Sequence, residues 1–218
     1  MSISTVPEPG PSAVTVALVG NPNCGKTALF NALTGSKQKV ANYPGVTVEK
    51  KIGRIKGTAE PIDLVDLPGT YSLSPRSLDE MVSVNVLLGR QSDVGKVDAV
   101  VCILDASNLE RNFYLACQVL DLGLPTVIVL NMFDVAKSRG VQIELNALSK
   151  KLGVQIVPTS AHRKEGIEAL KTAIAAAVPN GPGPRPHPFP EAFYSECHQL
   201  ASKLAELGRS DAPSVLVE

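Results

Sequence analysis

The stretch Gly20-Asn21-Pro22-Asn23-Cys24-Gly25-Lys26-Thr27 decides the fold of this chain. It is a complete GxxxxGK[ST] loop that follows an apolar run, Val14–Val19, and precedes Ala28–Thr34, where apolar residues recur at helical spacing. Glycines let the backbone curl so that its N–H groups point at phosphate oxygens, and the start of the following helix adds partial positive charge. This strand–loop–helix context predicts a nucleotide phosphate site rather than an ordinary glycine-containing turn.

Two side chains of this loop have roles that the motif predicts. Lys26 is expected to reach the β- and γ-phosphates, and the Thr27 hydroxyl is expected to bind magnesium. The rest of the loop, together with Ala28, is expected to line the nucleotide mainly through its backbone.

Composition narrows the class of protein. The chain has 218 residues, 44% of them hydrophobic, and its 21 basic residues balance its 21 acidic residues to a formal net charge of zero. Nucleic-acid-binding domains usually carry a basic excess, so this balance disfavours one. Residues 1–12 lack the pattern of a signal peptide, and no apolar run is long enough to predict a membrane span. The cysteines are far apart and form no CxxC pair, which suits a reducing compartment and argues against a zinc site: Cys24, Cys102, Cys117 and Cys197.

Strands and helices alternate along the chain, which predicts an α/β fold with a mostly parallel six-stranded sheet covered by helices on both faces. The segment Val48–Ile55 alternates only weakly and is expected at the edge of the sheet. The polar segment Ser36–Val46 contains Pro44-Gly45 and is expected to be a mobile loop. The strands are expected at Val14–Val19, Val48–Ile55, Pro61–Asp66, Asp98–Asp105, Pro125–Leu130 and Val154–Val157.

Start and stop signals place the helices. Ser77-Leu78-Asp79-Glu80 and Ser107-Asn108-Leu109-Glu110 each have the form of a capping box. The first should open a helix to about Leu88, and the second should open a helix to about Leu122. Two further helices are expected, over Ile143–Leu152 and Glu165–Ala177.

The chain is expected to divide into four parts. Residues 1–12 are rich in Ser, Pro and Gly and are expected to be disordered, and residues 13–178 form the nucleotide-binding domain. Residues 179–190 are a Pro/Gly linker. Residues 191–218 should begin a partial helical domain, because the amphipathic helix expected over Glu191–Leu207 cannot bury its apolar face alone. The sequence thus has the character of a fragment of a longer protein.

Three further segments come directly after strands and should meet the phosphate loop at the carboxyl edge of the sheet. They are Asp66-Leu67-Pro68-Gly69, Asn131-Met132-Phe133-Asp134 and Thr159-Ser160-Ala161. In the first, the Asp66 carboxylate is expected to hold magnesium through water, and the Gly69 N–H is expected to face the γ-phosphate.

The second and third of these segments should read the base. The Asp134 carboxylate can accept two hydrogen bonds from the N1 and N2 edge of guanine, whereas adenine presents no matching pair of donors. Ser160 and Ala161 are expected to complete the pocket through backbone N–H groups directed at the guanine carbonyl. Together with Asn131 and Met132, they predict a guanine nucleotide as the ligand.

The last expected magnesium ligand is Thr47, directly after the predicted mobile loop. Thr47 is expected to bind magnesium only while a γ-phosphate is present, with Gly45 and Val46 lining the nucleotide beside it. The expected magnesium ligands are therefore Thr27, Thr47 and Asp66, and the residues expected to act in catalysis are Asn23, Lys26, Thr47 and Gly69.

In this order, the segments resemble those of TRAFAC-class GTPases such as Ras. A closer resemblance, over about Val14–Ala177, is to the cytosolic N-terminal G domain of FeoB, the bacterial ferrous-iron transporter family. The family usually has serine where this chain has Cys24 and threonine where it has Ala28, and neither change touches Lys26 or Thr27. The stretches that carry the resemblance are Gly20–Thr27, Asn42–Glu49, Asp66–Leu73 and Asp105–Asn112.

The resemblance implies a domain that binds GTP and GDP, hydrolyses GTP slowly and regulates ferrous-iron uptake. Its implied partners are the nucleotide and the transmembrane part of the same transporter, with no nucleic acid and with homo-oligomers of the full-length protein left open. The full-length protein would lie at the cytoplasmic face of the bacterial inner membrane, while this fragment would be soluble. The helical segment after the linker would restrain GDP release.

Catalysis is expected to depart from that of Ras. Ras-like enzymes carry a glutamine after the glycine of the Asp-x-x-Gly segment, whereas this chain has Thr70, so the intrinsic rate is expected to be on the order of 10⁻³ per second. In related GTPases with Pro-Asn in the phosphate loop, the asparagine that matches Asn23 helps to hold potassium, which could take the place of an arginine finger. The alternative is that Asn23 only shapes the turn. Asp79 and Glu80 could position water, although a solvated helix start is the favoured interpretation.

Two other functions stay open. One is an RNA- or ribosome-associated, potassium-dependent GTPase, which the neutral net charge disfavours. The other is a nucleotide-binding interaction module with little turnover, which the missing glutamine keeps in play.

Overall fold

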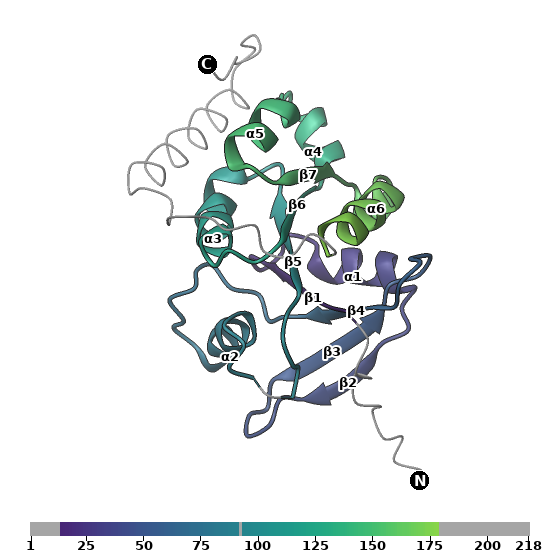
Figure 1. Cartoon of the computed structure of the whole chain (residues 1–218). Coiled ribbons are helices and arrows are strands. Elements are labelled where there is room, and N and C mark those ends of the chain that lie inside the picture. The colour runs from purple at the N-terminus through teal and green to yellow at the C-terminus, as the bar shows by residue number, and fades with distance from the viewer. Residues whose placement is uncertain (1–13, 92, 179–218) are drawn as a thin grey trace.

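The structure is a computed structural model that describes residues 14–91 and 93–178 (Figure 1). The expected disordered N-terminus, the Pro/Gly linker and the helical segment after it lie outside the described residues. Within the described ranges, no helix is both long enough and apolar enough to cross a membrane.

A seven-stranded sheet forms the centre of the molecule, with the strand order β2-β3-β4-β1-β5-β6-β7. Five strands are parallel to one another, and the two at one side, β2 and β3, run antiparallel to their neighbours. The mostly parallel α/β architecture predicted from the alternating pattern is therefore confirmed. The strands are β1 (Val14–Gly20), β2 (Lys39–Asn42), β3 (Glu49–Arg54), β4 (Ile62–Asp66), β5 (Ala99–Asp105), β6 (Thr126–Asn131) and β7 (Gln155–Pro158).

The edge of the sheet corrects two expectations. The prediction of six strands was one short, because part of the segment expected to be a mobile loop forms β2, which pairs with β3 from Lys39↔Ile52 to Asn42↔Glu49. Consequently β3 is not the edge strand. None of the residues of β2 is buried, and its sequence lacks the alternating apolar residues that would predict a strand. Its strand conformation therefore depends on pairing with β3.

Helices cover both faces of the sheet (Figure 1). One buried cluster includes side chains of α2, α3, α4 and α5, and the other includes side chains of α1 and α6. The central strand β1 serves both, because Ala17 and Val19 belong to the first cluster while Val16 and Leu18 belong to the second. The helices are α1 (Lys26–Thr34), α2 (Leu78–Leu87), α3 (Leu109–Asp121), α4 (Phe133–Ser138), α5 (Leu145–Leu152) and α6 (Ile167–Ala177), with a short 3₁₀ turn η1 (Ala161–Arg163).

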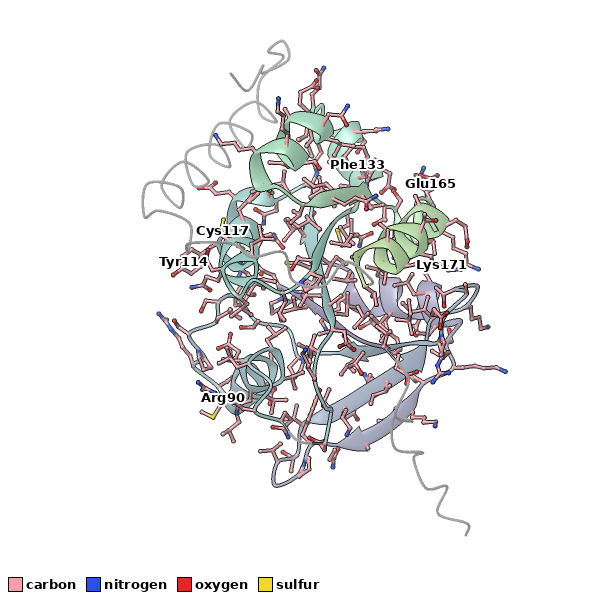
Figure 2. The ribbon with its side chains drawn as sticks, in the orientation of Figure 1. Arg90, Tyr114, Cys117, Phe133, Glu165 and Lys171 are labelled. Atoms are coloured by element: carbon pink, nitrogen blue, oxygen red, sulfur yellow. The ribbon has the colours of Figure 1, made fainter. Side chains whose placement is uncertain are left out.

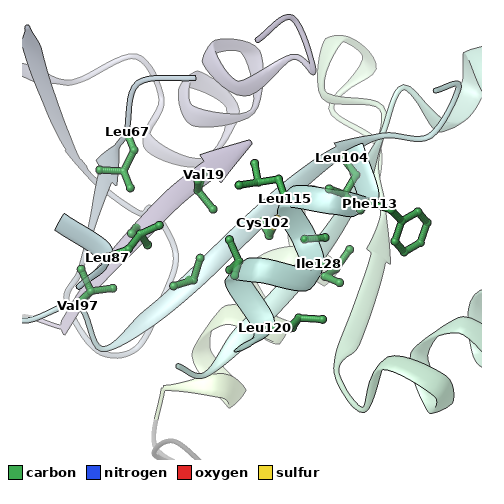
Figure 3. Packing of buried hydrophobic residues seen from close by; sticks show 14 of the residues in the cluster. Val19, Leu67, Leu87, Val97, Cys102, Leu104, Phe113, Leu115, Leu120 and Ile128 are labelled. Carbon is green, nitrogen blue, oxygen red and sulfur yellow. The ribbon is translucent and has the colours of Figure 1, made fainter. Parts of the chain in front are cut away.

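Helix α3 packs deeply against the sheet, with eight of its thirteen residues buried. Figure 3 shows Phe113, Leu115 and Leu120 of this helix against Cys102 and Leu104 of β5. All five side chains are at most 2% exposed. Burying such side chains contributes roughly 1.5–3 kcal/mol each, so α3 is held firmly against the centre of the sheet.

The serine half of the first predicted capping box is confirmed, while its glutamate binds the N–H of the residue before the N-cap. The Ser77 hydroxyl accepts a hydrogen bond from the Glu80 N–H (3.2 Å) at the start of α2, and the Glu80 carboxylate accepts one from the Arg76 N–H (2.8 Å). Glu80 therefore serves the helix start, as the favoured interpretation held.

The second capping box was wrong. The Ser107 hydroxyl donates to Asp105 Oδ1 (2.7 Å) at the end of β5, and α3 begins at Leu109 with Asn108 as its N-cap residue. A hydrogen bond to the charged carboxylate two residues earlier is stronger than a hydrogen bond that caps the helix. The serine hydroxyl is therefore used there. The short helix α4 was not predicted, and α6 begins two residues later than expected.

Candidate nucleotide-binding site

The phosphate loop joins β1 to α1 at the carboxyl edge of the sheet, as predicted. Gly25 precedes α1 with a φ of 86°, and a Cβ atom there would overlap the Asn131 side-chain amide. Glycine is thus required both by the backbone conformation and by the close approach of Asn131. The loop therefore depends on a residue more than one hundred positions later in the chain.

Cys24 contributes its backbone to the loop and its side chain to the core. The side chain is 1% exposed and lies next to Gly20 and Ile103, and burial raises the pKa of its thiol to about 11. The expectation that Cys24 faces the phosphate region mainly through its backbone agrees with this position.

The two asparagines of the loop have different environments. Asn21 is buried, and its Nδ2 donates to the carbonyl of Arg111 in α3 (3.0 Å), so its side chain ties the loop to α3. Asn23 is exposed and has a φ of 67°, a left-handed conformation that asparagine tolerates better than most residues. Asn23 therefore shapes the turn and also keeps its side chain accessible.

Lys26 and Asp66 form an ion pair. Lys26 Nζ lies 2.6 Å from Asp66 Oδ1, and the two side chains are only 13% and 7% exposed. Lys26 is the first residue of α1 and Asp66 is the last of β4, so the fold places the expected phosphate ligand beside the expected magnesium ligand. Thr27, the next residue of α1, is exposed at the same helix start.

The segment after Asp66 packs directly on the phosphate loop. A Cβ atom at Gly69 would lie 3.2 Å from Pro22, and the Thr70 N–H donates to the Gly20 carbonyl (3.2 Å). Thr70 is completely buried, and its hydroxyl donates to the Ser72 carbonyl (2.6 Å). Thr70, which stands where Ras-like enzymes have a glutamine, therefore stabilises the segment after Asp66 and its contact with the phosphate loop.

The remaining members of this segment also have structural contacts. Leu67 is fully buried in the core, and the Pro68 carbonyl accepts a hydrogen bond from the Ser83 hydroxyl of α2 (2.8 Å). The hydrogen bond links the middle of α2 to the residues beside the phosphate loop.

Asn131 connects the phosphate loop to the base-reading loop. Its Nδ2 donates to the Cys24 carbonyl (2.9 Å), and its Oδ1 accepts from the Thr159 hydroxyl (3.2 Å) and the Ala161 N–H (3.0 Å). The residue itself is 3% exposed. One buried side chain therefore fixes the relative positions of three segments that the sequence only places in order.

The Asp134 carboxylate at the start of α4 has a side-chain partner on each oxygen. The Ser160 hydroxyl donates to Oδ1 (2.9 Å), and Arg163 Nε lies 3.1 Å from Oδ2. The hydrogen bond from Ser160 lowers the pKa of the Asp134 carboxyl, and a backbone hydrogen bond from Val135 and the charge of Arg163 lower it further.

The expectation that the Ser160 and Ala161 N–H groups face the guanine carbonyl differs from the structure. The Ser160 N–H donates to the Glu165 carbonyl (3.1 Å) while its hydroxyl reaches Asp134, and the Ala161 N–H donates to Asn131 Oδ1 (3.0 Å), because the closed loop 160–165 and the buried Asn131 side chain supply nearby acceptors.

Sequence reasoning missed Arg163, because an arginine in a loop of charged residues carries no motif. Met132, which was expected among the nucleotide-binding residues, adopts a φ of 57° between Asn131 and the start of α4. Figure 2 shows Phe133, which lies inside the first base-reading segment, and Glu165, which ends the loop that carries Ser160 and Ala161, toward the same end of the molecule. The Phe133 N–H donates to the Thr159 carbonyl (3.1 Å), which joins the two segments.

Thr47 lies exposed in the turn between β2 and β3, after the equally exposed Gly45 and the half-buried Val46. Tyr43 anchors this turn: it is 1% exposed, and its N–H donates to the Val48 carbonyl (2.9 Å). The ammonium of Lys50 lies 5.8 Å from the Tyr43 ring centroid. The role of Thr47 as a magnesium ligand stays a prediction.

Comparison with known proteins identifies the family. A family model described as "Ferrous iron transport protein B" matches residues 14–174. The chain belongs to the FeoB family. It is 50% identical over 165 residues to the Fe(2+) transporter FeoB of Escherichia coli (strain K12), a match that covers 74% of this chain and 21% of that protein. The chain thus corresponds to the N-terminal part of much longer relatives.

Solved FeoB structures share the fold. The FeoB G domain from Methanococcus jannaschii is 43% identical with a TM-score of 0.67, over 77% of this chain and 99% of that one. The cytosolic domain of L. pneumophila FeoB is 42% identical with a TM-score of 0.71, over 75% of this chain and 63% of that one. The Ras-like fold is therefore confirmed, and these matches do not favour the alternative of an RNA- or ribosome-associated GTPase.

Proposed function

We propose that this domain binds GTP and GDP with magnesium and hydrolyses GTP slowly. The observation that supports this most strongly is the set of contacts made by Asn131, which joins the phosphate loop at Cys24 to the base-reading loop at Ala161. Asn131 would then hold the base site at Asp134 and the phosphate site at Lys26 in fixed relative positions. Several solved FeoB structures contain GDP, among them an S. thermophilus NFeoB mutant and a T. maritima cytosolic domain.

The residues beside the phosphate loop suit a magnesium ion. Magnesium prefers oxygen ligands at carboxylates and hydroxyls, and the nearly buried Asp66 carboxylate and the Thr27 hydroxyl offer both at the start of α1. Thr47 would add a second hydroxyl when a γ-phosphate draws its turn toward the site. The ion would neutralise charge that develops on the phosphates, and Lys26 would do so from the protein side.

Slow turnover follows from the residue after Gly69. Thr70 is buried and bonded to Ser72, so it cannot orient an attacking water as a glutamine would. Asn23 is accessible beside the phosphate loop, which suits the proposed potassium ligand. A cation held there would stabilise charge developing between the β- and γ-phosphates, in the place of an arginine.

The domain would act as the regulatory part of a ferrous-iron transporter. Its partners would be the nucleotide and the transmembrane part of the same protein, and the full-length protein would lie at the cytoplasmic face of the bacterial inner membrane. This proposal is drawn from the family to which the chain belongs. The chain matches only 21% of the length of its E. coli relative, so the transport function would belong to the longer protein.

The test is GTP turnover in potassium and in sodium at equal ionic strength, for the wild type and for Asn23→Ala. The wild type should turn over faster in potassium, and Asn23→Ala should lose that difference. Equal wild-type rates in the two salts would refute potassium stimulation, and a potassium effect that survives in Asn23→Ala would exclude Asn23 as the ligand. Single-turnover hydrolysis measured in parallel would show whether the domain is an enzyme or only a nucleotide-binding interaction module.

A further inference from the structure

We propose that Arg163 is a positioning residue of the guanine site, which holds the Asp134 carboxylate in the orientation that reads the base. This inference rests on the proposed function, because it concerns the same base pocket. The observation behind it is that the two oxygens of Asp134 are held by different partners, Ser160 on Oδ1 and Arg163 on Oδ2.

Two contacts on two oxygens determine the plane of a carboxylate. The terminal torsion of an aspartate is broad, so a carboxylate held at one oxygen can still rotate. Ser160 donates a hydrogen bond to Oδ1, and Arg163 Nε forms an ion pair with Oδ2, while each carboxylate oxygen can accept at about two lone-pair positions. The carboxylate is thereby oriented while both oxygens keep the capacity to accept the paired N1 and N2 donors of guanine.

Arg163 belongs to the same short loop as the second base-reading group. Ser160 and Glu165 exchange two backbone hydrogen bonds (3.1 and 3.2 Å), and the Arg163 N–H donates to the Ser160 carbonyl (2.9 Å). The loop 160–165 is therefore closed on itself. Ala161 lies inside it, between the two side chains that hold Asp134, so the Arg163–Asp134 contact also fixes Ala161 relative to α4.

The exposure of Arg163 indicates that its loss should affect base recognition more than folding stability. Its side chain is 64% exposed, against 25% for Asp134. An ion pair at such exposure contributes little to folding, because water and salt screen it. The loss of Arg163 should therefore change base recognition much more than the stability of the fold.

The experiment compares Arg163→Ala and Arg163→Lys with Arg139→Ala. Arg139 is an exposed arginine at the other end of α4, so its replacement changes the net charge equally. Affinities and dissociation rates are measured for GDP and for IDP, whose base has the N1 donor but lacks the exocyclic amine. If Arg163 orients the carboxylate, Arg163→Ala should reduce the preference for GDP over IDP by about three- to five-fold.

The other variants refine this expectation. Arg163→Lys should fall between the wild type and Arg163→Ala, because lysine keeps the charge but not the planar geometry of the guanidinium. Arg139→Ala should match the wild type. In an Asp134→Asn background, Arg163→Ala should cause no further change in the binding of xanthine nucleotides, and a further loss there would show that Arg163 does not act through Asp134.

Each remaining outcome has a definite meaning. A wild type that fails to bind GDP would overturn the proposed function together with this inference. A wild type that prefers GDP, with an Arg163→Ala variant that keeps the full preference or binds GDP more tightly, would overturn the inference alone. Equal weakening of GDP and IDP would also overturn it, since that result would indicate a general loosening of the loop.

Discussion

Replacement of Asn131 by alanine tests whether its hydrogen bonds hold the phosphate loop and the base-reading segments together. The substitution removes three hydrogen bonds of a 3% exposed side chain, to the Cys24 carbonyl, the Thr159 hydroxyl and the Ala161 N–H. Each bond contributes about 1 kcal/mol net, and partners left unpaired in the interior add to the loss. The free energy of unfolding should therefore fall by about 3–5 kcal/mol, a large part of the roughly 5–15 kcal/mol of a typical domain.

The assay is thermal or urea unfolding of the nucleotide-free protein, so that ligand binding does not contribute to the difference. At roughly 2–4 °C per kcal/mol for a domain of this size, Tm should fall by about 10 °C. Asn146→Ala is the matched control, because Asn146 is exposed on α5 and its replacement should change stability by about 0.5 kcal/mol or less.

A double-mutant cycle separates the hydrogen bonds from the general effect of truncation. Thr159→Val should cost about 1 kcal/mol in the wild type, because it removes the bond to Asn131 Oδ1, and much less in the Asn131→Ala background. If Asn131→Ala lost less than about 1 kcal/mol, or if the Thr159→Val effect were the same in both backgrounds, the contacts of Asn131 would not hold the site together.

Three further substitutions address single groups. Asp134→Asn should weaken GTP binding and shift the preference toward xanthine nucleotides, because an amide cannot accept both guanine donors; titration with both nucleotides checks this, and unchanged GTP affinity would remove Asp134 from the pocket. Thr47→Ala should slow GTP hydrolysis and leave GDP affinity nearly intact, whereas an equal loss of GDP affinity would make Thr47 a structural residue. Tyr43→Phe should leave stability unchanged or raise it by up to about 1 kcal/mol, because the buried Tyr43 hydroxyl has no hydrogen-bond partner among the described residues; a clear drop in Tm would contradict this.

Predictions about individual segments of the sheet depended on local patterns. Strands such as β1 and β5 are continuous apolar runs that bury both faces, so their sequence identifies them regardless of their neighbours. The strand β2 has no such pattern, and it exists because β3 offers an unpaired edge. The wrong capping box at Ser107 has a local origin instead, since its hydroxyl donates to the Asp105 carboxylate two residues earlier, at the end of β5.

The sequence by itself determined the loop Gly20–Thr27, the order of the four site segments and the family, because these depend on residue types at fixed spacing. Only the tertiary structure decided what holds the site together. Asn131 bonds a carbonyl 107 positions away, and Arg163 reaches Asp134 of α4 from within the loop 160–165. Contacts of this kind depend on how strands and helices pack, and no local pattern records which distant backbone group a side chain will meet.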